Sequence, residues 1–254
     1  MRSHINSSAP LAHEVLGAVF QVRCATHTPE GGPPTLQVLL WQRALDPHLG
    51  RWSLPGGRLR PDEDVENSIR RQLAEKVDVT QLTHVEQLAV FSAPDRVPGP
   101  RVVATAFLAL IRSGVDPEVP EDTAWHEVDS LPRTAFDHEA IIGRARDRLR
   151  AKLSYTNAGF ALAPGEFTIS ALRDLYSAAL GYRVSATNLQ RVLARRGLLS
   201  ATGRTSPPGR SGGRPAALFS FTKHDMQVTD PFAVLRPPPP EPARRRSARR
   251  ASPS

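Results

Sequence analysis

Apolar residues in the first 150 positions follow two patterns, short continuous runs and a repeat of four. The runs predict buried strands, because a strand that is covered on both faces is apolar at successive positions. They lie at residues 14–22, 37–42, 85–91 and 102–111, and a further strand is expected at 124–128, which is not a continuous apolar run. The repeat begins at Val65 and ends at Val77, and it predicts an amphipathic helix over residues 62–77. A second apolar stripe predicts a helix behind Asp137, which is placed to cap its start.

Two shorter amphipathic helices are predicted in the second part of the chain. The first covers residues 169–180 and ends at Gly181, a residue type that suits the left-handed turn after a helix. The second starts behind the capping residue Ser185 and stops near Gly197. Its buried stripe consists of Leu189, Val192 and Leu193. Two helices joined by a short turn predict a helix-turn-helix.

Residues 198–202 and 218–221 read as a pair of strands, and the loop between them holds Arg204, Arg210 and Arg214. This arrangement is typical of a wing, in which Arg214 would enter a narrow minor groove. A flexible, solvated loop is the alternative. Side chains that avoid the buried stripe of the second helix, together with the wing, are the DNA-binding candidates. They are Thr187, Asn188, Gln190, Arg191, Arg195, Arg196, Arg210 and Arg214.

The charge distribution strengthens this reading. Residues 1–150 carry 17 basic and 20 acidic side chains, whereas residues 151–254 carry 16 basic and 5 acidic ones. The second part therefore has a net charge of +11 and is expected to meet a polyanion. Nearly all the basic residues are Arg, a bias that a coding preference also explains. Five arginines between residues 244 and 250 either add nonspecific phosphate binding or only improve solubility.

Length and cysteine content bound the class of protein. A chain of 254 residues suits two domains. The single Cys24 excludes an internal disulfide, which fits a reducing compartment. No apolar run has the length of a membrane span, and residues 1–10 lack the apolar core of a signal peptide. We expect a cytoplasmic protein with no membrane contact.

The stretch from Trp52 to Val79 resembles the Nudix box of diphosphate hydrolases. That pattern is Gly, five residues, Glu, seven residues, then Arg-Glu-apolar-x-Glu-Glu-x-Gly-apolar. The spacing is kept by Gly57, Glu63, Arg71, Leu73, Glu75 and Val79. The positions that depart from it are Gln72, Lys76 and Asp78, which stand where the pattern has Glu, Glu and Gly.

These departures bear on catalysis. Gln72, Glu75 and Lys76 are three and four residues apart, so they share one helix face. Three carboxylates there would form an oxygen site for Mg²⁺, whereas Gln, Glu and Lys together carry no net charge. We therefore expect no catalytic residue, no metal site and no required cofactor. The alternative is an active, Mg²⁺-dependent ADP-ribose pyrophosphohydrolase with an accessory nucleic-acid domain, in which Glu63 and Glu75 still hold one ion.

The junction between the two parts resembles the NrtR family, Nudix-related transcriptional regulators of NAD metabolism. The resemblance rests on Ala-Phe-Asp-His at 135–138, Tyr-Thr at 155–156, Phe-Ala-Leu at 160–162 and Glu-Phe-Thr at 166–168. It implies an α/β (α+β) fold class, with a Nudix-like α/β/α sandwich around a mixed sheet and a C-terminal winged helix-turn-helix domain. It also implies a homodimeric repressor of NAD biosynthesis or salvage genes that binds a palindromic operator on double-stranded DNA, with ADP-ribose or a related nucleotide as effector.

The domain boundaries follow from these patterns. We expect a disordered tail at 1–11, the effector domain at 12–152, the winged helix-turn-helix at 153–226 and a Pro/Arg-rich disordered tail at 227–254. By resemblance, Arg43, Trp52 and Glu75 are expected at the ligand pocket. His138 is either a ligand or base, or a structural contact at the start of a helix.

Overall fold

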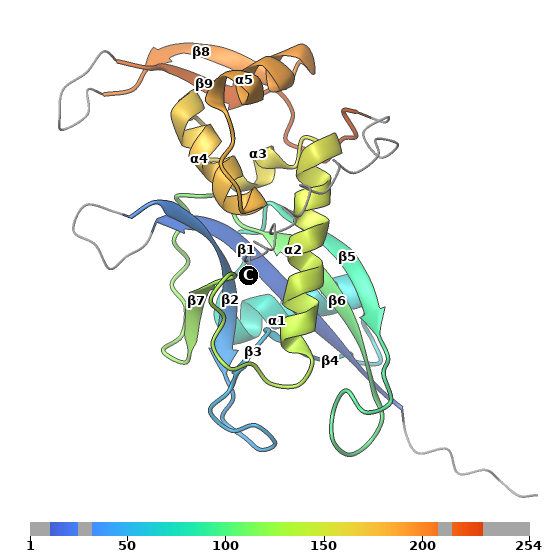
Figure 1. The fold of residues 1–254 in the computed structure, drawn as a ribbon. Helices are drawn as coiled ribbons and strands as arrows, with labels where there is room; N and C mark the ends of the chain where they lie inside the picture. The colour runs from blue at the N-terminus through green and yellow to red at the C-terminus, as the bar shows by residue number, and fades with distance from the viewer. Residues whose placement is uncertain (1–10, 25–31, 208–214, 231–254) are drawn as a thin grey trace, which may run out of the picture.

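The computed structural model describes residues 11–24, 32–207 and 215–230. Most of the two predicted tails lies outside these ranges, as do Arg210 and Arg214 of the predicted wing loop. Within the described residues, none of the helices combines the length and apolar character that crossing a membrane requires. Figure 1 shows the two parts of the chain, with the large sheet below and the smaller C-terminal domain above it.

The N-terminal domain is built on one mixed sheet of seven strands. These are β1 (Ala12–Cys24), β2 (Pro34–Gln42), β3 (Trp52–Ser53), β4 (Gly56–Arg58), β5 (His84–Phe91), β6 (Val102–Leu110) and β7 (Thr123–Glu127). Their order is β3-β2-β1-β6-β5, with β4 paired to β1 and β7 paired to β2. The central strand β1 runs parallel to β6 and antiparallel to β2 and β4. The predicted mixed sheet is confirmed.

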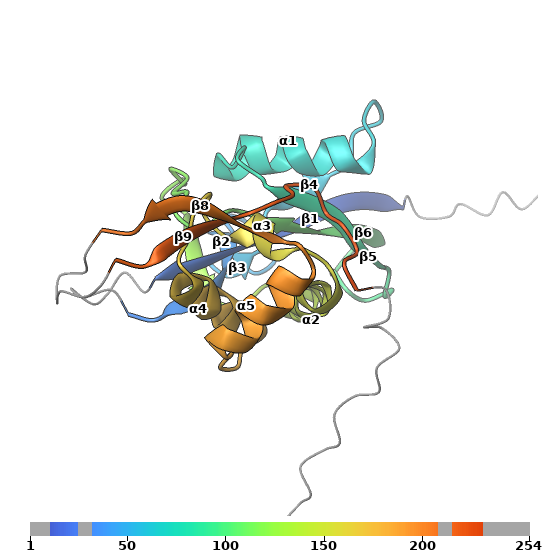
Figure 2. The same ribbon diagram turned by 90° about the horizontal axis from the view of Figure 1, so that it is seen from above.

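One helix covers each face of this sheet: α1 (Val65–Val77) and α2 (His138–Tyr155) (Figure 2). Successive side chains of a strand point to opposite faces, so β1 supplies both layers of core. Val15 packs in the layer that contains Leu73 of α1, whereas Leu16 packs in the layer that contains Ile142 of α2. The α/β/α sandwich expected from the sequence is therefore present.

The ends of the two helices differ in part from the prediction. Helix α1 begins at Val65, three residues later than expected, because Asp64 caps it by accepting a hydrogen bond from the amide of Asn67 at 2.7 Å. At its other end Asp78 adopts a φ of 52°, the left-handed conformation that a Gly in the Nudix pattern would favour. Asp137 is the N-cap residue of α2, as predicted, but its side chain makes no capping hydrogen bond because its carboxylate binds Arg96.

The C-terminal domain has the predicted winged helix-turn-helix order. It comprises α3 (Gly159–Leu162), α4 (Ile169–Leu180), α5 (Ala186–Arg195), β8 (Leu199–Thr205) and β9 (Ala217–Phe221). Gly181 ends α4 with a φ of 77°, and Ser185 caps α5. The strands β8 and β9 pair antiparallel. Since β8 continues to Thr205, Arg204 lies in a strand and not in the wing loop.

The two domains share one core, and α2 belongs to both. Buried residues from the sheet, such as Leu16, and from the winged helix, such as Leu175, form a single apolar cluster. The boundary placed between residues 152 and 153 therefore falls inside α2. The tail predicted from residue 227 also starts too early: Val228 pairs with Thr156, and the amide of Thr229 donates to the Tyr155 carbonyl at 2.8 Å.

Candidate functional site

A cavity of about 310 Å³ lies beside the Nudix-like loop. The first two strands, the loop around Gly56, the end of α1 and the start of α2 all contribute to its wall. The lining residues are Glu14, Leu16, Trp41, Arg43, Ala44, Leu45, Ser53, Leu54, Gly56, Gly57, Lys76, Phe136 and His138. The cavity is thus formed by segments that are far apart in the sequence and that the fold of the N-terminal domain brings together.

Gly57 and Gln72 make a close contact at the floor of this loop. A Cβ atom on Gly57 would lie 2.7 Å from the side-chain amide of Gln72, so a larger residue there would displace the end of the Gln72 side chain. Gln72 is 5% exposed, and its amide donates to the carbonyl of Arg58 at 3.4 Å. The predicted shared face is therefore divided, because Gln72 is buried beneath the loop while Lys76 reaches the cavity.

Lys76 places its ammonium group in the cavity. Its Nζ donates to the backbone carbonyl of Gly56 at 2.5 Å and lies 5.2 Å from the centre of the Trp41 ring. Burial of the ammonium lowers the pKa of Lys76, and the negative charge of Glu14 partly offsets this effect. The side chain that replaces a Nudix carboxylate thus brings a positive charge to the loop.

The two carboxylates that the Nudix pattern retains are both paired with Arg71. Glu63 accepts two hydrogen bonds from its guanidinium, at 2.5 and 2.8 Å, and these bonds lower the pKa of Glu63 to about 2. Glu75 accepts a third, at 2.9 Å, and Arg60 lies 3.6 Å from it. These carboxylates therefore neutralise guanidinium groups outside the cavity wall.

The donor set does not fit the divalent ion that a Nudix hydrolase uses. A hard cation takes several oxygen ligands in one place, mostly from carboxylates and carbonyls. Here Gln72 is buried under Gly57, Glu75 is bound to Arg71, and the Gly56 carbonyl is taken by the ammonium of Lys76. A metal ion at this carbonyl would meet a like charge.

Of the three residues that were expected at the ligand pocket, one lines the cavity and two do not. Arg43 lines the cavity, and its guanidinium lies 4.8 Å from the centre of the Phe136 ring. Trp52 does not line it, because its ring packs edge-on against His126 at 4.2 Å. Glu75 also lies outside the lining, on the side of α1 that carries Arg71.

A buried arginine braces the wall behind Glu14. Arg96, from the loop between β5 and β6, donates to Glu14 at 2.6 Å and to Asp137 at 2.7 and 2.9 Å. Burial disfavours the charged guanidinium, but the bonds to the two carboxylates outweigh it and raise the pKa of Arg96. The loop between β5 and β6 therefore has a structural role.

His138 is a structural contact at the start of α2. It is 4% exposed, and its Nδ1 accepts a hydrogen bond from the amide of Leu54 at 3.0 Å. Burial lowers the pKa of His138 to about 3, so the imidazole is neutral at pH 7. A neutral ring that accepts a backbone proton fixes the segment next to Gly56 rather than serving as a base.

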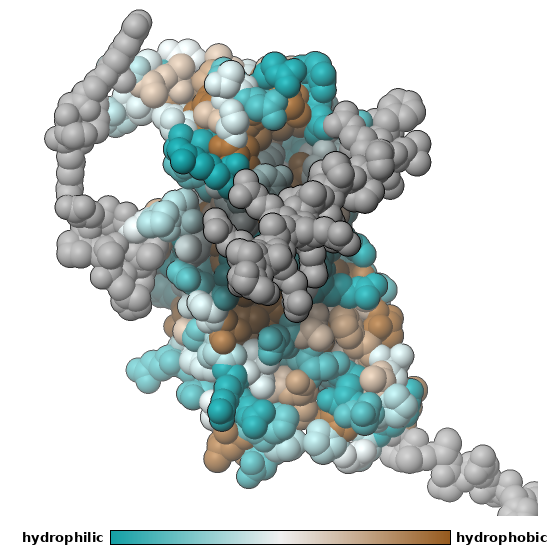
Figure 3. Space-filling view, in the orientation of Figure 1, coloured by the Kyte–Doolittle hydropathy of each residue, from teal (hydrophilic) through white to brown (hydrophobic). Residues whose placement is uncertain are grey.

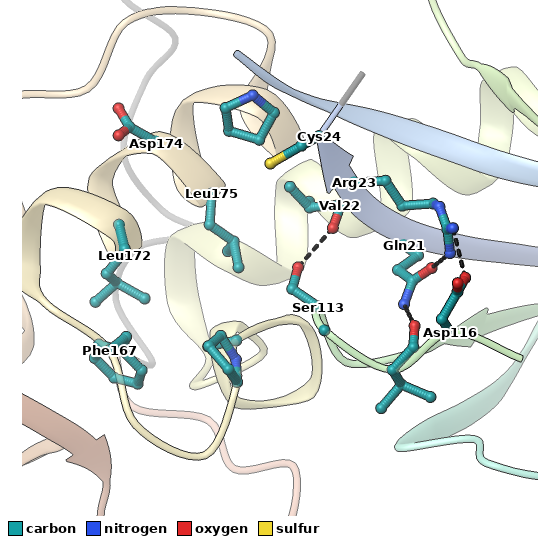
Figure 4. A pocket seen from close by; sticks show the side chains of 16 residues that line it. Gln21, Val22, Arg23, Cys24, Ser113, Asp116, Phe167, Leu172, Asp174 and Leu175 are labelled. Carbon is teal, nitrogen blue, oxygen red and sulfur yellow. Dashed lines mark hydrogen bonds and ion pairs between the residues drawn. The ribbon is translucent and has the colours of Figure 1, made fainter. Parts of the chain in front are cut away.

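A larger cavity of about 490 Å³ lies between the two domains, where the end of β1 faces α4 (Figure 4). Val22, Leu172 and Leu175 give it a largely apolar wall. The guanidinium of Arg23 is bound to Asp116 at 2.6 Å. Because a phosphate needs available positive charge, the smaller cavity with Lys76 and Arg43 is the better match for a nucleotide.

The exposed face of α5 carries the polar residues predicted for DNA contact. Those on this face are Thr187, Asn188, Gln190, Arg191 and Arg195. Arg191 donates to Asn188 at 2.7 Å, which holds both side chains on the same side of the helix. Hydrophilic residues are prominent on the outer part of this domain in Figure 3. Leu189 and Leu193 anchor the opposite side in the core, while Val192 is half-buried.

Arg196 does not belong to this face, so the prediction that it points outward is wrong. Its side chain is 11% exposed, and its guanidinium donates to the Ser154 carbonyl at 3.1 Å and to Asp230 at 2.8 Å. Because α5 ends at Arg195, the next side chain turns back toward α2. Arg196 therefore ties the end of α5 to the end of the helix that both domains share.

Several residues of the site were not foreseen from the sequence. Glu14 and Trp41 lie within strand-forming runs, and Phe136 lies in the connection before α2. Their spacing carries no signal, because only the pairing of the strands brings them to the loop. Phe136 could have been suspected because it lies two residues before His138. No local sequence feature identifies Arg96 as a buried partner of Asp137.

Comparisons with known proteins agree with this architecture. A NUDIX domain matches residues 22–148, and an NrtR DNA-binding winged helix domain matches residues 159–221. The chain is 29% identical over 209 residues to the ADPR responsive transcriptional repressor NtrR of Acinetobacter baylyi, covering 80% of this chain and 82% of that protein. It is 31% identical over 121 residues to the ADP-ribose pyrophosphatase of Methanocaldococcus jannaschii, covering 46% of this chain and 68% of that enzyme.

A solved structure extends the similarity to both domains. The structure of Shewanella oneidensis NrtR complexed with a 27mer DNA is 30% identical and superposes with a TM-score of 0.65, covering 82% of this chain and 93% of that one. In both comparisons the Nudix domain comes first and the winged helix second, as in the fold described above. With its Nudix domain followed by an NrtR winged helix, the chain belongs to the NrtR family.

Proposed function

We propose that the protein is a transcriptional repressor that binds operator DNA and senses a nucleotide diphosphate, with ADP-ribose as the first candidate. One observation carries the proposal: a cavity with two cationic side chains and an exposed polar recognition helix are joined through one core. The DNA-bound NrtR and the ADPR responsive NtrR among the relatives support its two parts. Genes of NAD biosynthesis or salvage are the expected targets.

The DNA contact is assigned to α5. Its exposed side chains include amide and guanidinium groups, which can hydrogen-bond base edges in a major groove. A helix-turn-helix reads a short half-site, and a dimer reads two of them about one helical turn apart. We therefore propose a homodimer on a palindromic operator.

The link between the two sites is assigned to α2. Its first residue, His138, lines the nucleotide cavity, and its last, Tyr155, accepts backbone hydrogen bonds from Thr229 and Asp230. Asp230 in turn binds Arg196 at the end of α5. An effector that favours one position of α2 over another would change the setting of α5, with a coupling of about 1–3 kcal/mol as is usual for such proteins.

Operator binding is tested by fluorescence anisotropy on a duplex selected by the purified protein from a random library. We expect Gln190→Ala to weaken binding to this duplex by about 1–3 kcal/mol, because a base contact is lost. Arg70→Ala is the control, since it removes a positive charge from α1, on the face of the sheet away from the winged helix (Figure 2). No selection of any duplex at low salt, or equal losses in the two variants, would contradict the assignment.

Hydrolysis is the second candidate function, because Glu63 and Glu75 remain and one relative is an ADP-ribose pyrophosphatase. We expect no Mg²⁺-dependent turnover of ADP-ribose, since the metal face lacks the necessary oxygen ligands. The assay is phosphate release in the presence of a coupled phosphatase. Turnover that requires Mg²⁺ and disappears in Glu75→Gln would establish the enzyme instead.

A further inference from the structure

The ammonium of Lys76 stands at an oxygen atom of the kind that a divalent cation would take. Its Nζ is 2.5 Å from the Gly56 carbonyl, within the loop that opens the Nudix box. Backbone carbonyls are regular ligands of hard cations. A lysine that reaches such an oxygen supplies a fixed positive charge at that point without any metal.

We propose that the Lys76 ammonium replaces the divalent cation of Nudix enzymes, so that this protein binds the diphosphate group of its ligand without a metal ion. The inference rests on the proposed function, from which it takes the ligand class. It goes further by naming the residue that neutralises the diphosphate and by predicting that binding needs no Mg²⁺.

The geometry leaves Lys76 able to bind an anion. An ammonium has three N–H donors, and the Gly56 carbonyl accepts from one of them. The ammonium also lies over the Trp41 ring, so the ring and the carbonyl together hold the charge in place. Arg43 adds a second positive charge in the same cavity, and these two charges outweigh the one negative charge of Glu14, which Arg96 binds together with Asp137. The cavity therefore has an excess of positive charge.

Burial of the ammonium is consistent with this role. Burial lowers the pKa of Lys76, and the approach of an anionic diphosphate favours its charged form. The retained carboxylates do not compete, because Glu63 and Glu75 are held by Arg71. Charge and hydrogen-bonding capacity therefore both favour a diphosphate at Lys76.

The test is isothermal titration calorimetry with ADP-ribose on the full chain, in Mg²⁺ and in EDTA. We expect the same Kd in both buffers. Lys76→Met keeps an unbranched side chain of similar length but removes the charge, and it should weaken binding about ten- to hundredfold. Lys76→Arg should retain most of the affinity. Lys223→Met is the matched control, because Lys223 is an exposed lysine outside the cavity. Thermal unfolding of each variant checks that it is folded.

A gain of metal dependence provides a second readout. Lys76→Glu places a carboxylate beside the Gly56 carbonyl, so any remaining affinity for ADP-ribose should become stronger with Mg²⁺ than with EDTA. Wild-type binding that is lost in EDTA, or unchanged affinity in folded Lys76→Met, would overturn the inference and leave the proposed repressor function standing. If inorganic pyrophosphate, NAD and ADP-ribose all fail to bind wild type, the inference falls together with the effector part of that function.

Discussion

At the scale of single residues, His138 is a buried polar residue at the point where α2 begins beside the cavity. Its neutral ring accepts the proton of the Leu54 amide, next to the loop that carries Gly56. The histidine of the unfolded chain titrates near pH 6.5, whereas in the folded protein the pKa is about 3. Between these two pH values the histidine is protonated in the unfolded state and neutral in the folded state. The free energy of unfolding therefore falls as the pH falls from 6.5 towards 3.

We therefore expect His138 to contribute a loss of about 2 kcal/mol in the free energy of unfolding between pH 8 and pH 5. His138→Gln keeps an acceptor for the Leu54 amide but cannot titrate, so its loss over the same range should be smaller by about this amount. Urea unfolding at the two pH values measures the difference. His224→Gln, at an exposed position, is the control. An unchanged pH dependence in His138→Gln would show that the buried ring carries no such penalty.

Two neighbouring arginines separate the structural from the DNA-facing part of α5. Arg195 is exposed, whereas Arg196 is bound to Ser154 and Asp230. We expect Arg196→Ala to destabilise the protein by about 1–3 kcal/mol, because charged and carbonyl acceptors lose their donor. Arg195→Ala should change stability by less than about 0.5 kcal/mol. Chemical denaturation measures both, and equal effects of the two variants would contradict the assignment.

The residues themselves were partly predictable. The sequence shows directly that Gln72 and Lys76 stand where the Nudix pattern has carboxylates, and the loss of the metal site stays a prediction. The sequence did not indicate that Gln72 is buried under Gly57 or that Lys76 reaches a carbonyl, since these contacts depend on how α1 packs against the loop. Arg196 was misassigned because helical spacing stops applying at the residue where α5 ends.

At the scale of elements, long periodic segments were predicted well and short ones were not. The strands β1, β2, β5, β6 and β7 and the helices α1, α2, α4 and α5 all appear close to their predicted positions. The strands β3 (Trp52–Ser53) and β4 (Gly56–Arg58) were missed, because two or three residues give no periodicity. Their pairing with β2 and β1 is what holds the Nudix loop at the cavity.

Helix α2 is the element whose role changed most. The sequence indicated a helix that closes the first domain, but its last turn packs in the core of the second. An 18-residue helix spans about 27 Å, so α2 reaches from the cavity at Lys76 to the winged helix. A boundary drawn from composition cannot detect such sharing, because each end of the helix has an ordinary apolar stripe.

At the scale of the whole molecule, the distribution of charge along the chain agrees with the order of the two domains. The part of the chain with a net charge of +11 contains the winged helix, and the first part contains the cavity at Lys76. Because one apolar cluster joins the two domains, the winged helix is packed against the Nudix domain and is not a tethered neighbour. The charge asymmetry was visible in the sequence, whereas the shared core required the fold.

We propose above all that a nucleotide diphosphate controls DNA binding by this protein. The most direct measurement is fluorescence anisotropy of the wild-type protein on its selected operator during titration with ADP-ribose, with AMP as the control ligand that lacks a diphosphate. The claim predicts that ADP-ribose changes operator affinity by about five- to 150-fold and that AMP does not. Operator affinity that stays the same at saturating ADP-ribose, although calorimetry shows that ADP-ribose binds, would contradict it.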